Sequence, residues 1–239
     1  MALPALLEEQ ARHQLQTAPD ADILDALRTM VDHPDYPCLG ARSVFRRESA
    51  DVIVLDDLGD TSDGGSLDLL GEKLQAFGTR SVDAGTSMGD LVSLIAVFRE
   101  PVTRSEEQFE TLLWAALRRL HRFDEQPWAP EVSADPSSAH FSFSYHQTAY
   151  FIVGLHPAAS RIGRRTPLPT LVFNLHAQFE QLRSDARFTR IRETIRRRDE
   201  ALNGSVNPMV DDYGDSSEAR QYSGRAVPPT WLAPFPKEP

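Results

Sequence analysis

The chain of 239 residues is long enough to bury a sizeable core, and a composition of 41% hydrophobic and 25% charged residues excludes wholesale disorder and fibrous repeats. Its formal net charge of −10 argues against nonspecific binding to nucleic acids. A single cysteine excludes an internal disulfide and any zinc or iron–sulfur site built from several thiolates.

The sequence shows neither a membrane-spanning pattern nor a signal-peptide pattern. No apolar run approaches the roughly 20 residues that span a bilayer. The stretch MALPALLEEQ has neither a basic n-region nor a cleavage pattern. We therefore expect a cytoplasmic protein that does not bind membranes.

The first third of the chain alternates between helical and strand patterns. Residues 1–33 are predicted to be helical, with Asp20 or Asp22 as a cap, until two prolines end the helix and a short helix begins at Cys38. The apolar spacing predicts a buried strand at Val52–Leu55, a helix at Leu67–Phe77 and a second strand at Leu91–Phe98. The acidic, glycine-rich loop between the first strand and the helix is expected to be exposed and mobile.

The strongest helical pattern follows that second strand. Thr103–Glu106 reads T-x-x-E, which predicts a capped helix start. Its apolar residues form one stripe that faces the core. They are Phe109, Leu112, Leu113, Ala116, Leu117 and Leu120. Residues 124–136, with three prolines, are expected to be a surface linker.

A β-hairpin is predicted at about residues 140–155, with its turn near His146–Thr148. In its first strand Ser142 and Ser144 share one face, opposite three aromatic side chains. This face is either solvated or a flat shelf for a planar ligand.

Later segments complete the fold prediction. The pattern predicts a strand at Thr170–Phe173, a helix capped by Asn174, a helix at about Ala186–Leu202 that stops at Gly204, and an irregular tail at about 226–239. The expected class is α+β: a single domain over residues 1–239 with a mixed, mainly antiparallel sheet covered by helices.

Arginine is concentrated in one segment. Ten arginines and three acids lie between His156 and Arg198, a local charge of +7. A guanidinium pairs with carboxylate or phosphate through two hydrogen bonds, so a small anionic ligand is expected in part of this segment. Residues 183–198 are instead expected to form a solvated helix face.

Three stretches carry candidate chemistry, since Walker, G-x-G-x-x-G, H-E-x-x-H and G-x-S-x-G motifs do not occur. Cys38, at an expected helix start, is either a buried structural thiol or a thiolate for attack or metal ligation. His156 ends a strand just before an arginine cluster, which suits either an imidazole ligand beside an anion clamp or an ordinary loop histidine. The cluster comprises Arg161, Arg164 and Arg165.

The polar stretch at 203–225 is the third candidate. Long irregular loops in compact domains are often functional. Its carboxylates could bind a cationic substrate or pair with neighbouring arginines. They are Asp211, Asp212 and Glu218.

Five motifs resemble the YqcI/YcgG family, in the family's order and over roughly residues 36–235. They are Y-P-C-L-G-A-R, F-x-F-S-Y-x-x-x-Y-F-I-V-G-L-H-P-A-A-S-R-x-x-R-R, L-V-F-N-x-H-x-Q-F-E-x-L-R, I-R-x-R-D-x-A-L-N-G-S-x-N-P-M and S-E-A-R-Q-Y-S-G-R. Characterised members of that family are haem-dependent N-oxygenases of basic amino acids, which hydroxylate a guanidino nitrogen or oxidise the lysine side-chain amine.

The resemblance therefore implies haem b (protohaem), dioxygen or peroxide, an electron donor if dioxygen is used, and a small cationic amino-acid substrate such as arginine or lysine. Cys38 is the first choice for the iron ligand, because thiolate donates electron density that favours O–O cleavage, and His156 is the alternative. The resemblance gives the other candidates expected roles. The arginines Arg161, Arg164 and Arg165 would clamp the propionates, Ser142 and Ser144 would lie along the porphyrin, and Asp211, Asp212 or Glu218 would hold the substrate's cationic end.

Two other functions compete with this expectation. A haem-binding sensor or carrier would show a haem spectrum without a hydroxylated product. A cysteine-nucleophile enzyme would be inactivated by alkylation without any pigment. The residues leave open the substrate, the extent of oxidation, the electron donor and the oligomeric state.

Overall fold

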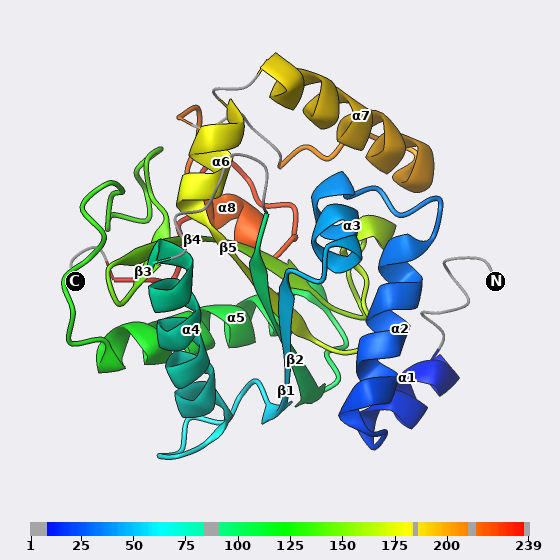
Figure 1. Cartoon of the computed structure of the whole chain (residues 1–239), viewed down its shortest axis with the longest axis horizontal. Helices are drawn as coiled ribbons and strands as arrows, with labels where there is room; N and C mark the ends of the chain where they lie inside the picture. The colour runs from blue at the N-terminus through cyan, green and yellow to red at the C-terminus, as the bar shows by residue number, and fades with distance from the viewer. Residues whose placement is uncertain (1–8, 84–90, 184–185, 210–213, 237–239) are drawn as a thin grey trace.

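One five-stranded mixed sheet organises the chain (Figure 1). The computed structural model describes residues 9–83, 91–183, 186–209 and 214–236. The strand order is β1-β2-β5-β4-β3, with β1 and β2 parallel and the remaining neighbours antiparallel. The strands are β1 (Ala50–Asp57), β2 (Ser93–Glu100), β3 (Phe143–Tyr145), β4 (Thr148–Leu155) and β5 (Thr170–Leu175). The predicted α+β class is confirmed.

Helices cover both faces of this sheet. Helices α4 and α5 pack on what we call the first face, and α2 and α3 pack on the second face (Figure 1). The helices are α1 (Glu9–Gln16), α2 (Asp20–Asp32), α3 (Leu39–Arg46), α4 (Ser66–Asp83), α5 (Glu106–Phe123), α6 (His176–Arg183), α7 (Ala186–Asn203) and α8 (Ala219–Tyr222). None of the helices in these described ranges is long and apolar enough to cross a membrane.

Strand alternation divides the apolar residues between two clusters. In β2, Leu94, Ala96 and Phe98 join α4 and α5 in the larger cluster, whereas Ile95 and Val97 join α2 in the smaller one. Successive side chains of a strand point to opposite faces, so a continuous apolar run in β2 buries both faces. The predicted stripe of α5 is confirmed, since five of its six residues are buried and Leu112 is half-buried.

Three predicted helix caps are wrong. Ser105 caps α5 by accepting a hydrogen bond from the Gln108 amide at 3.1 Å, so the helix starts two residues after the predicted Thr103 cap. Pro19 precedes α2 without a side-chain cap, which places Asp20 in the first turn. Asn174 lies inside β5, where its amide donates to the carbonyl of Phe151 at 3.2 Å.

The predicted hairpin and helix end are confirmed. His146 and Gln147 have φ angles of 47° and 59°, which is the left-handed pair that a tight two-residue turn between β3 and β4 requires. Gly204 has a φ of 74° and its amide donates to the carbonyl of Glu200 at 2.8 Å, closing α7. The described part of the tail contains no helix or strand, although Phe235 is buried against α5.

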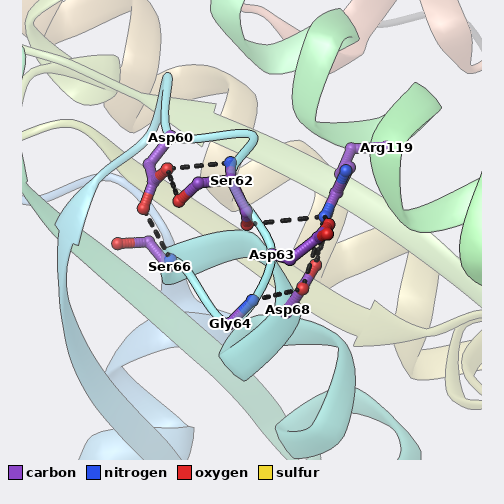
Figure 2. Close-up of polar contacts among 7 residues, drawn as sticks. All are labelled: Asp60, Ser62, Asp63, Gly64, Ser66, Asp68 and Arg119. Atoms are coloured by element: carbon purple, nitrogen blue, oxygen red, sulfur yellow. Dashed lines mark hydrogen bonds and ion pairs between the residues drawn. The ribbon is translucent and has the colours of Figure 1, made fainter.

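The acidic loop between β1 and α4 is exposed, as expected, but is tied down by hydrogen bonds (Figure 2). The Asp60 carboxylate accepts from the Ser62 hydroxyl at 2.5 Å and from the amides of Ser62 at 2.9 Å and Ser66 at 3.2 Å, and these contacts hold the pKa of Asp60 below its usual value. Arg119 of α5 binds Asp63 at 3.1 Å and Asp68 at 3.0 Å. The arginine supplies the counter-charge that this loop needs.

Candidate functional site

Cys38 lies at the start of α3, as predicted. Its backbone is extended (φ −79°, ψ 105°), and its Sγ accepts a hydrogen bond from the Ala41 amide at 3.4 Å. The side chain is half-buried and belongs to the cluster on the second face that includes Ala41 and Val172. The thiol therefore lies at the positive end of the helix dipole.

Two buried polar side chains surround this cysteine. Burial raises the pKa of Tyr36, and the nearby Cys38 adds to the effect. Burial lowers the pKa of Arg164, which also lies within electrostatic reach of Tyr36 and Cys38. Arg198 of α7 donates to the carbonyl of Tyr36 at 3.0 Å and so ties the Y-P-C segment to that helix.

His156 follows β4 and is completely buried. Its ring stacks on Phe109 of α5, with centroids 4.4 Å apart and planes 16° apart, and its Nδ1 lies 3.4 Å from the Thr103 hydroxyl. Its Nε2 has no hydrogen-bond partner in the described part of the chain. Burial, then the charges of Arg164 and Arg165, lowers the pKa of His156 to about 4. At neutral pH the imidazole is therefore neutral, the form that binds metals.

The two candidate ligands lie toward different faces of the sheet. His156 stacks against α5 of the first face, whereas Cys38 packs with α3 on the second face. Arg164 lies between them: its backbone carbonyl accepts from the His156 amide at 3.0 Å, and its guanidinium is close to Cys38. The structure thus brings Cys38 and Arg164 together and separates Cys38 from the His156 ring.

The predicted arginine cluster is engaged with protein acceptors rather than open. Each of the three guanidinium groups donates to a carboxylate or to backbone carbonyls. The contacts are Arg161 to Asp199 and, at 2.7 Å, to the Ser205 carbonyl, Arg164 to the carbonyls of Gly154 at 3.1 Å and Gln221 at 3.2 Å, and Arg165 to the Ala159 carbonyl at 2.7 Å. A bound anion would have to compete with these contacts.

The expected serine shelf is wrong, because both hydroxyls are buried in the protein. Ser144 is 1% exposed, and its Oγ accepts from the Ala129 amide at 2.9 Å. Ser142 is 0% exposed, donates to Glu218 and lies 3.0 Å from Nδ1 of His176. The strand alternates as predicted, but residues from other elements cover its polar face.

Of the candidate carboxylates, Glu218 is buried in a polar cluster. Glu218, just before α8, is 4% exposed and lies in a cluster with Ser142 and His176. Nε2 of His176 lies 3.6 Å from Glu180 one turn along α6. The sequence does not single out His176, since nothing in it relates this residue to Glu218, 42 positions away. Asp211 and Asp212 lie outside the described residues.

The second face of β4 and β5 is only partly covered. Val153, Val172 and Asn174, which point to this face, are half-buried although both strands are interior to the sheet, whereas the Phe151 ring contacts Phe179 of α6 and Tyr222 of α8. Their first-face neighbours are almost inaccessible: Tyr150, Ile152, Leu171 and Phe173 are all 0% exposed. Cys38 and Val172 both pack against the second-face cluster that contains Ile95 and Val97, so the thiol lies on the same side of the sheet as this partly covered surface.

Comparison with known proteins supports the family indicated by the motifs. The model of the YqcI/YcgG family matches residues 27–236. The chain is 29% identical over 204 residues to a Bacillus subtilis (strain 168) protein named "Uncharacterized protein YcgG", covering 81% of this chain and 78% of that protein. No solved structure matches. The chain belongs to the YqcI/YcgG family.

Proposed function

We propose that the protein is a cytoplasmic, haem-dependent monooxygenase that oxygenates the side-chain nitrogen of a basic amino acid such as arginine or lysine. The observation that carries the proposal is the position of Cys38. A half-buried thiol at a helix start lies on the same side of the sheet as the half-buried Val153 and Val172 of two interior strands. The motifs shared with haem-dependent N-oxygenases of the family support the same reaction.

The residues around Cys38 suit a haem. A haem needs an apolar surface and a donor to its iron, and Val153 and Val172 would supply the first while Cys38 would supply the second. When bound, the haem would supply the activation of dioxygen or peroxide. Arg164, held by the carbonyls of Gly154 and Gln221, would place a positive charge within electrostatic reach of this ligand.

His156 is the alternative ligand. Its partnerless Nε2 and lowered pKa suit metal binding, but the ring is 0% exposed and stacked on Phe109. Ligation there would require the packing around α5 to open. Cys38 is therefore the preferred iron ligand, and His156 is the alternative.

The substrate is proposed to be a small cation. Its charged end would pair with a carboxylate from the polar stretch at 203–225, namely Asp211, Asp212 or Glu218. For Glu218 the substrate would replace the contact with Ser142, because that carboxylate faces inward.

The optical spectrum of the haem-reconstituted protein with carbon monoxide tests the proposal. A Soret band at about 450 nm indicates a thiolate ligand, and one at about 420 nm indicates an imidazole ligand. Cys38→Ser should abolish the first band, and His156→Ala should leave it unchanged. Absence of any Soret band after reconstitution would overturn the haem proposal.

Mass spectrometry of reactions with arginine, lysine and related guanidines tests turnover. The expected product is one oxygen atom heavier than its substrate. A normal haem spectrum without product from any basic amino acid would favour the non-catalytic sensor or carrier. Inactivation by alkylation of Cys38 in a protein that takes up no haem would favour the cysteine nucleophile.

A further inference from the structure

A groove of ≈ 720 Å³ lies along the outer edge of the sheet, at β1. Helix α4 forms one wall, and α2 with the end of α3 forms the other. Figure 1 shows β1 between these two groups of helices, with no strand beyond it. The groove holds no cysteine or histidine, so it is separate from the proposed haem site.

The groove is too short for an added β-strand. It is lined by Ala50–Ile53, only half of the eight-residue strand, which corresponds to about 13 Å. Farther along β1 the edge is already in use, because the Asp57 amide donates to the Ser66 hydroxyl at 3.0 Å. A volume of ≈ 720 Å³ falls within the range of small-molecule pockets. The geometry therefore favours a small molecule over an extended peptide.

The apolar lining comes from both walls. Phe45 of α3 and Phe77 of α4 contribute aromatic rings, and Val52 and Ile53 of β1 contribute branched side chains from the two faces of the strand. A ligand in this groove would therefore bury an apolar body against aromatic and aliphatic surface.

The charged lining favours an anion. Arg28 of α2 and Lys73 of α4 lie on opposite walls and are exposed. Neither makes a hydrogen bond or ion pair with any residue that the structure describes. Of the two acids in the lining, Asp51 is neutralised by Arg80, and Glu48 remains at the end of α3. In a protein of net charge −10, two cations without ion-pair partners in the described part of the chain, one on each wall of this groove and opposed there only by Glu48, are a local site for negative charge.

We infer that this groove binds a small amphipathic anion, an organic carboxylate or sulfonate whose apolar body contacts Phe45 and Phe77 and whose head group lies between Arg28 and Lys73. The site is distinct from that of the proposed cationic substrate, both in charge and in position. Its occupant would touch α2, α3 and α4 together.

Titration of the full chain with 8-anilinonaphthalene-1-sulfonate, followed by fluorescence and calorimetry, tests this inference. We expect saturable binding of one probe per chain, and competition by decanoate. The double variant Arg28→Glu/Lys73→Glu should weaken binding by about tenfold or more, because it replaces both attractive charges with repulsive ones. Ala76→Trp should block binding sterically, since Ala76 is an exposed groove residue of α4.

A second double variant, with substitutions in α5 and in the segment before it, serves as a charge-matched control. Arg104→Glu/Arg122→Glu changes the net charge equally at two exposed arginines outside the groove and should leave probe affinity unchanged. Cys38→Ser should also leave it unchanged, which separates this site from the haem proposal. Equal affinity in wild type, the groove double variant and Ala76→Trp would overturn the inference. So would displacement of the probe by an acidic hexapeptide but not by decanoate.

Discussion

The two faces of the sheet are covered very differently. On the first face of β4 and β5, Ile152, Leu171 and Phe173 are 0% exposed, whereas on the second face the central residues Val153, Val172 and Asn174 are half-buried and only the strand ends are buried. Stability is thus concentrated where α4 and α5 pack. The other face, on whose side Cys38 lies, keeps apolar surface available to a ligand. Neighbouring residues of one strand can in this way serve different purposes.

The largest expected effect comes from a comparison of two single substitutions in β5, one on each face of the sheet. Phe173→Ala should lower the free energy of unfolding by about 3–5 kcal/mol, because it leaves a cavity in the first-face core. Val172→Ala, one residue away on the second face, should cost about 1 kcal/mol or less. Urea denaturation of the haem-free protein measures both. Similar losses for the two variants would show that the faces are equally packed.

A buried ion pair should give the next largest effect. Glu110 of α5 is 8% exposed, binds Arg225 through Nε at 2.9 Å and accepts from the Ser223 hydroxyl at 3.1 Å. Glu110→Ala should cost about 3 kcal/mol, because it leaves a largely buried guanidinium without its carboxylate. Glu110→Gln keeps an acceptor and should cost less. An unchanged denaturation midpoint for Glu110→Ala would argue against this role for the pair.

The His156 side chain should make the stability of the haem-free protein depend on pH. Its pKa is about 4 when folded and 6.5 when exposed, so between these values the unfolded chain binds a proton that the folded chain does not. Stability is therefore full above pH 6.5 and falls as pH drops toward 4, by up to about 1.4 kcal/mol per pH unit. Comparison with His156→Phe isolates the effect, since that variant should lack this part of the slope. Parallel pH profiles for the two proteins would contradict it.

The smallest effect is expected in the acidic loop, far from both faces. Arg119→Gln removes the cation that bridges Asp63 and Asp68. We expect faster amide hydrogen exchange at residues 60–66 with little change in the denaturation midpoint, because both carboxylates reach solvent: the side chain of Asp63 is 95% exposed and that of Asp68 is 30% exposed. Global destabilisation would show that the loop is part of the core.

The elements could be predicted where spacing alone decides them. The stripe of α5, the β3–β4 hairpin and the end of α7 at Gly204 each follow from local periodicity or turn chemistry. The caps could not be predicted, because several polar residues compete at each helix start and tertiary contacts decide between them. Thr103, expected as a cap, instead lies beside His156.

The candidate site was less accessible to sequence reasoning. Alternation in the first hairpin strand correctly separates Ser142 from Phe143, but it cannot tell solvent from a covering element. The burial of Ser142 depends on His176 and Glu218, which arrive from 34 and 76 positions away. The position of Cys38 at a helix start was predictable. The partly covered surface of β4 and β5 was not, because it depends on which helices pack on the second face of the finished sheet.

The strand order also determines when the sheet can be completed during synthesis. Strand β5 lies between β2 and β4, yet it is the last strand in the sequence. A nascent chain that ends before residue 170 therefore contains only a β1–β2 pair and a β3–β4 hairpin, each with an inner edge that awaits its partner. Ribosomal release of residues 170–175 joins the two halves, so a pause before that point would leave aggregation-prone edges exposed longest.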